Sequence, residues 1–300
     1  MNIMSLDTFF QHLVNGISLG SLYALIAIGY TMVYGILRLI NFAHGDIFMM
    51  GAYFAFYSIV VFSMPWYVAV IVAIAVTSVL GIVIERAAYK PLRNAPKTSI
   101  LISAIGVSFL LESVATVAFG GTPKSFPQIA LFTDNITIGS VTMQKLTVII
   151  PVVTIILLVG LLYLVNRTKV GMAMRAVSRD YETSALMSIN TNRIISLTFV
   201  IGSLLASVGG VMWGLKYTTL LPLMGLMPGI KCFIAAVIGG IGDIKGAVLG
   251  GFILGLTEVM LVAFAPGLTG YRDAFAFILL IVILLVKPEG IMGKNVAEKV

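Results

Sequence analysis

The chain has 300 residues, of which 59% are hydrophobic and 10% are charged, and its mean hydropathy is +1.08. Such a small share of polar side chains cannot cover a soluble protein of this length. The composition therefore excludes a soluble globular domain and predicts a surface that lies mostly in lipid. The net charge of +7 does not indicate nucleic-acid binding, because the cations gather mainly in two loops, where they orient a membrane protein.

The apolar runs are about 20 residues long, which at about 1.5 Å per residue matches a bilayer core of roughly 30 Å. Their side chains do not alternate as the strands of a membrane barrel do. We therefore predict an all-α polytopic helical membrane protein with about eight or nine transmembrane helices, in a single domain over residues 1–300. The candidate spans are Leu13–Leu37, Phe42–Phe62, Trp66–Ile84, Ser99–Phe119, Leu146–Val165, Ile194–Leu215, Ile230–Ile241, Ala247–Phe264 and Ala274–Val286.

After the first span, the motif NFAHGD places Asn41, His44 and Asp46 between two apolar runs. This pattern predicts a polar joint between two helices, in which Asp46 can cap the second helix near its positive end. A capped joint on the cytoplasmic side is favoured over direct contact with a substrate, although Asn41 and His44 stay candidates for a translocation path. The alternative is a re-entrant break, which would move the N-terminus to the inside.

Two loops predict the orientation of the chain. Glu85–Lys97 and Asn166–Arg193 are rich in Lys and Arg, and the C-terminal tail adds Lys287, Lys294 and Lys299. Short basic loops stay in the cytoplasm. Since three spans precede Glu85, the N-terminus is predicted outside, on the same side as residues 120–145.

Two acidic residues fall inside predicted spans, Glu112 in the fourth and Glu258 in the eighth. A carboxylate at the centre of a bilayer costs several kcal/mol, so each side chain must face the protein interior or a wet cavity. A substrate path or proton relay and an interhelical hydrogen bond are about equally favoured for both residues.

The long basic loop contains GMAMRAVSRDYETSALMSIN, in which apolar and charged side chains alternate at helical spacing. This predicts short amphipathic helices joined by a turn outside the membrane. Such a surface either docks on a protein partner or lies on anionic headgroups, and the pattern alone does not decide between them.

The segment Ile230–Ile241 is too short to cross a bilayer alone, and its GGIGDIKG exit predicts a half-helix and a turn at depth. Five glycines around this exit recur at four-residue spacing: Gly242, Gly246 and Gly250, and then Gly251 and Gly255. Small residues at this spacing let helix backbones touch in lipid. Tight helix packing is therefore favoured over a glycine-lined pore.

The sequence lacks the motifs of an energy-converting or catalytic chain. It has no G-x-x-x-x-G-K-[ST] phosphate-binding loop and no H-E-x-x-H, and Cys232 is its only cysteine. We therefore predict a protein that is not an enzyme by itself, with no cofactor and no metal site.

Four blocks, in order, resemble the integral-membrane H-type permease subunits of bacterial branched-chain amino acid ABC importers. The blocks are NGISLGSLYALIAIGYTMVYGILRLINFAHGDIFMMGAY (15–53), MRAVSRDYETSALMSINTNRIISLTFVIG (174–202), KCFIAAVIGGIGDIKGAVLGGFILG (231–255) and ILLVKPEGIMGK (283–294). The resemblance implies a multi-pass permease of the inner membrane that imports branched-chain or related amino acids. It also implies a second related permease, two cytoplasmic ATPase subunits and a periplasmic solute-binding protein as partners.

The resemblance further implies that residues 166–193 form a cytoplasmic coupling loop that docks into a groove of an ATPase subunit. The implied contact residues are Gly171, Arg175, Ala176, Ala185 and Ser188. The family usually has glycine where Ser188 stands. The alternative function is an ion-gradient-driven secondary transporter, which would use Glu112 and Glu258.

Overall fold

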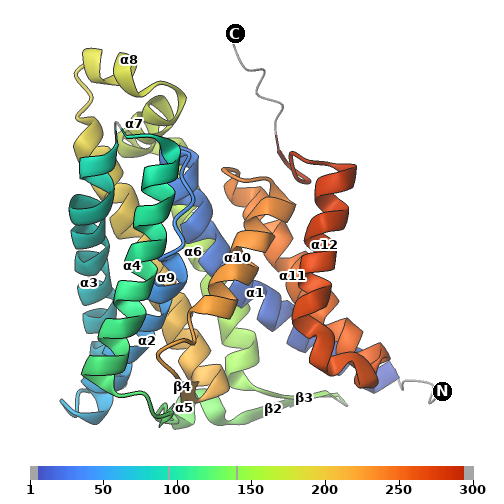
Figure 1. Cartoon of the computed structure of the whole chain (residues 1–300). Helices are drawn as coiled ribbons and strands as arrows, with labels where there is room; N and C mark the ends of the chain where they lie inside the picture. Colours follow the sequence, from blue (N-terminus) through green and yellow to red (C-terminus); the bar gives the residue numbers. More distant parts are fainter. Residues whose placement is uncertain (1–5, 94, 140, 294–300) are drawn as a thin grey trace.

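A computed structural model describes residues 6–93, 95–139 and 141–293 of the chain (Figure 1). Lys294 and Lys299 of the predicted basic tail lie outside the described residues. Each of the nine predicted spans forms a helix. The helices are α1 (Leu6–Leu37), α2 (His44–Val60), α3 (Trp66–Ile84), α4 (Lys97–Phe119), α6 (Lys145–Arg167), α9 (Thr191–Tyr217), α10 (Leu226–Gly239), α11 (Ile244–Phe264) and α12 (Arg272–Val286).

Within the described residues, seven helices are long and apolar enough to cross a membrane. The two predicted spans outside that group are α2, with 17 residues, and α10, with 14. The prediction of a polytopic helical membrane protein is thus confirmed.

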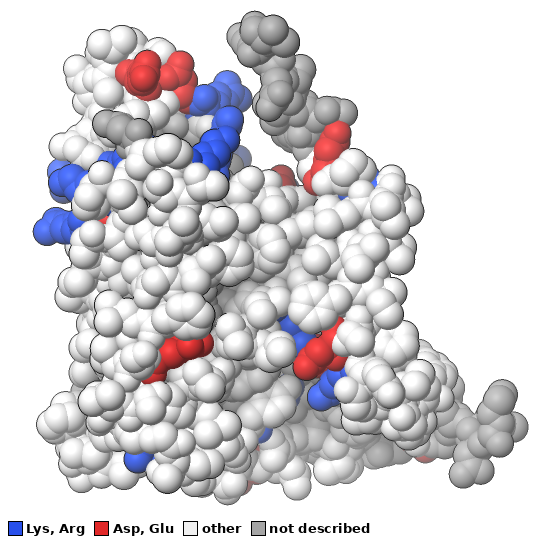
Figure 2. All heavy atoms as spheres, viewed as in Figure 1, with Lys and Arg blue, Asp and Glu red and all other residues white. Residues whose placement is uncertain are grey.

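The two ends of the helix bundle differ in charge and in structure. One end, called here the basic end, carries η1 (Glu85–Tyr89), η2 (Lys90–Leu92), α7 (Lys169–Arg179) and α8 (Tyr181–Leu186). Figure 2 shows Lys and Arg side chains gathered there. The opposite end carries α5 (Ala130–Thr133), η3 (Pro266–Tyr271) and two small antiparallel pairs. These are β1 (Lys124–Ser125) with β4 (Thr219–Leu220), and β2 (Asn135–Ile138) with β3 (Val141–Gln144). The first turn of α1 lies at this opposite end (Figure 1), as the alternation of spans predicts.

Helix α1 is the centre of the bundle. Its residues from Ser18 to Val33 are all buried, and it packs against α6, α9, α10 and α11. A helix that is apolar on every side is stable only where other helices or lipid surround it. By contrast, α3, α4, α6 and α12 turn large apolar side chains outward, as a lipid-facing layer does.

Glycines set the distance between α1 and α11. A Cβ atom added at Gly251 would overlap the backbone of Ala24, and one added at Gly255 would overlap the backbone of Gly20. These two helices touch through their main chains, which is how helices gain packing energy in a solvent as apolar as they are. The four-residue glycine spacing therefore serves helix packing.

The segment after α1 turns back into the bundle. The Nε2 atom of His44, the first residue of α2, lies 3.2 Å from the carbonyl oxygen of Ile26. Ile26 precedes the end of α1 by about three turns, or roughly 16 Å along the axis. Helix α2 therefore begins at membrane depth, and the prediction of a capped joint at the cytoplasmic surface is wrong.

Helix α10 also begins at depth. The backbone at Gly225 and Gly229 meets the backbone at Gly45, near the start of α2. The turn that follows α10 lies at the basic end, where Gly242 contacts Gly35 near the end of α1. The predicted half-helix is thus present, but its buried end is its start, and the GGIGDIKG turn is not at depth.

The glycine contacts predict a sharp difference between two substitutions. Gly255→Ala should lower the free energy of unfolding by at least about 1–3 kcal/mol, because the new methyl group must push two backbones apart. Gly160→Ala on the exposed face of α6 is the matched control, since an added Cβ there meets no atom within 4 Å. It should be neutral or slightly stabilising. Thermal unfolding of the purified protein in detergent measures both, and equal midpoints would contradict the packing account.

Candidate functional site

The predicted coupling loop forms two short helices that are anchored to the bundle. Thr168 caps α7 by accepting a hydrogen bond from the Gly171 amide (3.1 Å). Gly171 is buried, and an added Cβ would overlap the carbonyl oxygens of Leu164 and Val165 at the end of α6. The Arg175 guanidinium donates to the same Val165 carbonyl. Gly171 therefore fixes α7 against α6, whereas Arg175 bonds to the end of α6 and stays exposed.

Helix α8 has its own cap. The Asp180 carboxylate accepts hydrogen bonds from the Thr183 amide (2.9 Å) and hydroxyl (2.7 Å), and these bonds lower the pKa of Asp180. The chain leaves α8 through Ser188, whose φ of +63° is in the left-handed region. That conformation costs an L-residue about 1–2 kcal/mol and costs glycine little. This strain is a physical reason why glycine, which the resemblance implies for this position, would fit better than Ser188.

The apolar side chains of the loop divide into two groups. Met174 and Val177 are buried and pack with α1, α6 and α9. Leu186 is 85% exposed and Met187 is 73% exposed at the end of α8. The buried pair holds the loop in place, and the exposed pair is free to contact another molecule.

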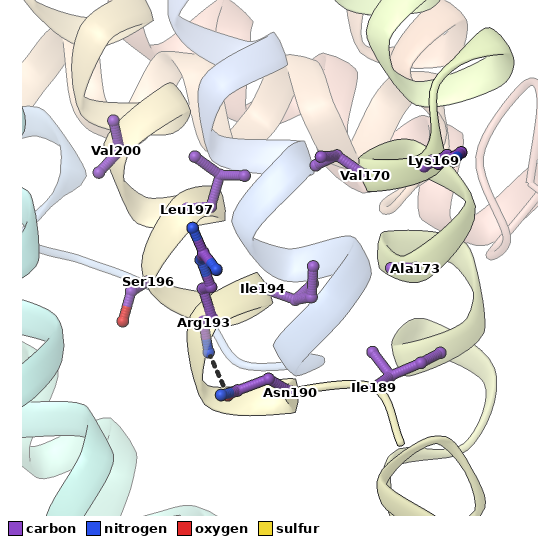
Figure 3. A pocket seen from close by; sticks show the side chains of 10 residues that line it. All are labelled: Lys169, Val170, Ala173, Ile189, Asn190, Arg193, Ile194, Ser196, Leu197 and Val200. Carbon is purple, nitrogen blue, oxygen red and sulfur yellow. Dashed lines mark hydrogen bonds between the residues drawn. The ribbon is translucent and has the colours of Figure 1, made fainter. Parts of the chain in front are cut away.

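A groove of about 660 Å³ runs between α7 and the start of α9 (Figure 3). Its lining is mostly apolar, with two cationic side chains, Lys169 and Arg193. Asn190 caps α9 beside it by accepting a hydrogen bond from the Arg193 amide (3.1 Å). The groove adds a second apolar surface to the basic end.

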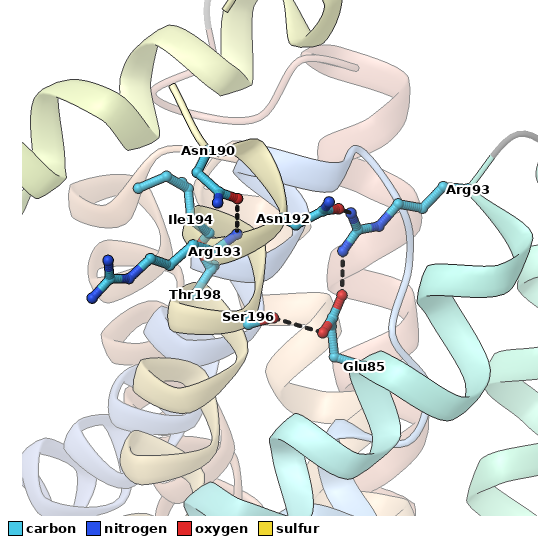
Figure 4. A network of polar contacts seen from close by, with 8 residues as sticks. All are labelled: Glu85, Arg93, Asn190, Asn192, Arg193, Ile194, Ser196 and Thr198. Atoms are coloured by element: carbon cyan, nitrogen blue, oxygen red, sulfur yellow. Dashed lines mark hydrogen bonds and ion pairs between the residues drawn. The ribbon is translucent and has the colours of Figure 1, made fainter. Parts of the chain in front are cut away.

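A buried ionic network joins the two basic loops (Figure 4). Glu85 is fully buried, and it accepts hydrogen bonds from the Arg93 guanidinium and from the Ser196 hydroxyl (2.8 Å). Arg93 also donates to the Asn192 side-chain oxygen. The network thus ties η1 and η2 to the first turns of α9, directly after the coupling helices.

The same loop reaches the re-entrant segment. The Tyr89 hydroxyl, at the end of η1, donates to the side-chain oxygen of Asn41 (2.7 Å). Asn41 is buried, as is His44. Both predicted path residues are therefore held by protein contacts at the point where the chain turns back into the bundle.

A small pocket of about 220 Å³ lies at membrane depth between α4 and α10. Figure 2 shows the surface hollowed between these two helices. Asp46 and Tyr30 are among its lining residues, and the Asp46 carboxylate accepts a hydrogen bond from Ser108 of α4 (2.5 Å). Asp46 does not cap α2. The pocket residues are Tyr30, Phe42, Gly45, Asp46, Ile105, Ser108, Phe109, Gly225, Leu226, Gly229, Ile230 and Phe233.

The two acidic residues predicted inside spans have different surroundings. Glu112 is half-buried on α4, one turn from Ser108. Glu258 is 4% exposed, and it accepts hydrogen bonds from the Tyr23 hydroxyl and the Lys231 ammonium, both 2.9 Å. The structure brings Glu258 to a cluster of charged residues and leaves Glu112 outside it.

The Glu258 cluster joins four helices. Arg272 lies 3.2 Å from the Glu258 carboxylate, and Asp273 lies 2.7 Å from the Lys231 ammonium. The cluster contains Tyr23 from α1, Lys231 from α10, Glu258 from α11, and Arg272 and Asp273 from α12. These contacts favour the interhelical packing role for Glu258. Sequence reasoning missed Lys231, whose signal was a lysine within the short apolar segment at Ile230–Ile241.

The Glu85 network predicts a large effect of a small change. Glu85→Gln should lower the free energy of unfolding by about 3 kcal/mol, because it leaves the Arg93 charge, only 13% exposed, without its counter-ion. Asp134→Asn breaks the exposed Lys145–Asp134 ion pair and should cost less than about 1 kcal/mol. Thermal denaturation in detergent compares the two variants. A loss for Glu85→Gln no greater than that for Asp134→Asn would show that the network does not stabilise the fold.

Comparison with known proteins identifies the family. Residues 12–284 match the family model described as branched-chain amino acid transport system / permease component. The chain is 43% identical to the high-affinity branched-chain amino acid transport system permease protein BraD of Pseudomonas aeruginosa, with 97% of this chain and 98% of the relative covered. It is 42% identical to the permease protein LivH of Escherichia coli over the same shares of both chains.

A more distant relative has the same description. The chain is 28% identical to the probable branched-chain amino acid transport permease protein LivH of Methanocaldococcus jannaschii, with 91% of this chain and 89% of the relative covered. The family model and the two bacterial relatives each match nearly the whole chain. The chain therefore belongs to the family of branched-chain amino acid transport system permease components.

Proposed function

We propose that this chain is a membrane-spanning subunit of an ATP-driven importer of branched-chain or related amino acids in the bacterial inner membrane. The observation that carries the proposal is the full-length similarity to BraD and LivH, whose names describe permease proteins of a high-affinity branched-chain amino acid transport system. The chain is a non-catalytic subunit, so ATP hydrolysis belongs to separate partner chains. A second related permease, two ATPase subunits and a periplasmic solute-binding protein complete the proposed assembly.

The exposed end of α8 is the proposed contact with an ATPase subunit. Ala185, Leu186, Met187 and Ser188 are all exposed there, on a loop whose other side is packed into the bundle. An exposed apolar surface on a rigid, anchored element is typical of a docking site. Gly171 and Arg175 hold α7 to the end of α6, and Ala176 is half-buried on α7.

The lateral face between α4 and α10 is the proposed contact with the second permease. Glu112 is half-buried on α4, one turn from Ser108 of the pocket, whereas Asp273 of α12 is about half exposed and is paired with Lys231. Carboxylates at membrane depth need protein or water next to them, not lipid. A second permease that covers this face would shield the Glu112 side chain from lipid and would enclose the pocket between the two subunits.

Docking through α8 makes a specific prediction for the assembly. Leu186→Glu should abolish co-purification of the ATPase subunits and reduce ATP-driven uptake at least tenfold, because it places a charge in an apolar contact. Ala185→Glu should act in the same direction. Phe62→Glu, which replaces a 67% exposed apolar side chain between α2 and α3, should leave co-purification unchanged. Normal co-purification with Leu186→Glu would refute the docking surface.

A second prediction separates the importer from the secondary transporter. The secondary transporter would need Glu112 or Glu258 as a proton carrier, and the Lys231–Glu258 ion pair fits the packing role for Glu258, which leaves Glu112 as the residue to test. In the importer, Glu112→Gln should retain at least about half of the uptake, because the amide keeps the shape of the contact and no proton needs to pass.

Uptake into proteoliposomes tests both functions. Transport should require ATP and the ATPase subunits and should persist after the ion gradient is collapsed. Uptake by this chain alone, driven by a gradient and lost in Glu112→Gln, would favour the secondary transporter.

A further inference from the structure

The groove between α7 and α9 is apolar except for two cations and two small polar side chains (Figure 3). Lys169, at the start of α7, and Arg193, in the first turn of α9, stand on its two walls, and no acidic residue lines it. Both side chains are exposed, and neither has a hydrogen bond or an ion pair within the described part of the chain. By contrast, the Arg93 guanidinium at the same end of the bundle pairs with the buried Glu85. The charges of the groove are therefore available to an anionic ligand.

The groove extends from the membrane surface into the apolar part of the membrane. Lys169 follows the end of one candidate span, α6, and Arg193 lies in the first turn of another, α9. Leu197 and Val200 line the groove farther along α9, and Val200 comes about two turns after Arg193, or roughly 10 Å along the axis. Figure 3 shows the Arg193 side chain extending along α9 toward Leu197. A ligand of this groove thus meets cations at the level of the lipid headgroups and apolar side chains at the level of the acyl chains.

We propose that this groove binds an anionic phospholipid of the inner membrane. The Arg193 guanidinium holds the phosphate, and Lys169 contributes a second positive charge from the α7 wall. One acyl chain lies against Val170, Leu197 and Val200. Such a lipid is a resident ligand, distinct from the imported solute and from the partner chains of the proposed importer.

The charge and the depth of the groove favour a phospholipid over a segment of a cytoplasmic subunit. A guanidinium group matches the geometry of a phosphate, and basic pockets at the cytoplasmic ends of spans suit anionic headgroups. A polypeptide that reached Val200 would carry backbone groups to a depth where lipid offers them no partner. A volume of about 660 Å³ holds the phosphate and the first part of one chain, because the rest of the lipid stays in the bilayer.

The bound lipid joins the coupling loop to the membrane-spanning bundle. Lys169, Val170 and Ala173 belong to α7, whereas Arg193 and Leu197 belong to α9, so one ligand contacts both helices. The exposed end of α8 stays free of the lipid for a protein partner. The basic loop therefore has two separate surfaces, one for a protein and one for an anionic headgroup.

The test uses the purified full-length chain in a neutral detergent, titrated with phosphatidylglycerol or with phosphatidylcholine of identical acyl chains. Native mass spectrometry should give an apparent affinity for phosphatidylglycerol at least tenfold higher than for phosphatidylcholine. The double variant Lys169→Gln with Arg193→Gln should lower the phosphatidylglycerol affinity at least tenfold, since each cation near an anionic headgroup contributes roughly fivefold. The matched control is Arg86→Gln with Lys90→Gln, which removes two exposed cations of the same end outside the groove. The control should change the affinity less than twofold.

A second variant tests the apolar part of the groove. Ala173→Phe fills the space and keeps both cations, so it should lower the phosphatidylglycerol affinity at least fivefold. Unchanged affinity in Ala173→Phe, equal affinity of the wild type for the two lipids, or equal losses in the two double variants would each overturn the inference.

Co-purification with the ATPase subunits distinguishes the other occupant. If Lys169→Gln with Arg193→Gln lost these subunits while its phosphatidylglycerol affinity stayed at the wild-type value, the groove would belong to the ATPase contact and the lipid site would be refuted. The lipid titrations use this chain alone. Their outcome is therefore independent of whether the assembled complex imports amino acids.

Discussion

Non-helical backbone lies at membrane depth in two places, before α2 and before α10, and the rest of the structure is arranged to cover it. Lipid offers no hydrogen-bond partner to a free N–H or C=O group, so such backbone must be enclosed by protein. Here the enclosure comes from main-chain contacts between Gly45, Gly225 and Gly229, and from the His44 ring on the Ile26 carbonyl. Because both helices start inside the bundle, the pocket between α4 and α10 can exist at this depth.

Hydropathy predicted the helices well, because each span is a long apolar run whose length is set by the bilayer. It did not predict where α2 and α10 begin, since a run of apolar residues looks the same whether its first turn meets headgroups or the interior of a bundle. The glycine spacing did indicate close packing. Only the structure shows that Gly251 and Gly255 face α1, while Gly160, also within an apolar helix, meets no neighbouring atom.

The candidate sites were predicted less completely, for a physical reason. An amphipathic pattern showed that the loop at 166–193 has an apolar face, but Met174 and Leu186 have the same chemistry and opposite environments. Polar partners that are far apart in the sequence could not be paired. Glu85 belongs to a loop that the sequence predicts as basic, yet its side chain is fully buried against Arg93. The sequence predicts Glu258 within a span but not its pairing with Lys231, 27 residues away.

The buried contacts link the two ends of the proposed mechanism in one continuous set. At the start of α9, the Asn192 side chain accepts a hydrogen bond from Arg93, and the Ser196 hydroxyl donates one to Glu85. Tyr89, which lies in η1 with Glu85, donates a hydrogen bond to Asn41. A force that moves α8 and the start of α9 must either break the buried Glu85–Arg93 pair or carry η1 with it. Breaking the pair is the costlier course, because it leaves charges buried without partners. Displacement at the basic end therefore reaches Asn41, which lies five residues before Asp46, a lining residue of the pocket.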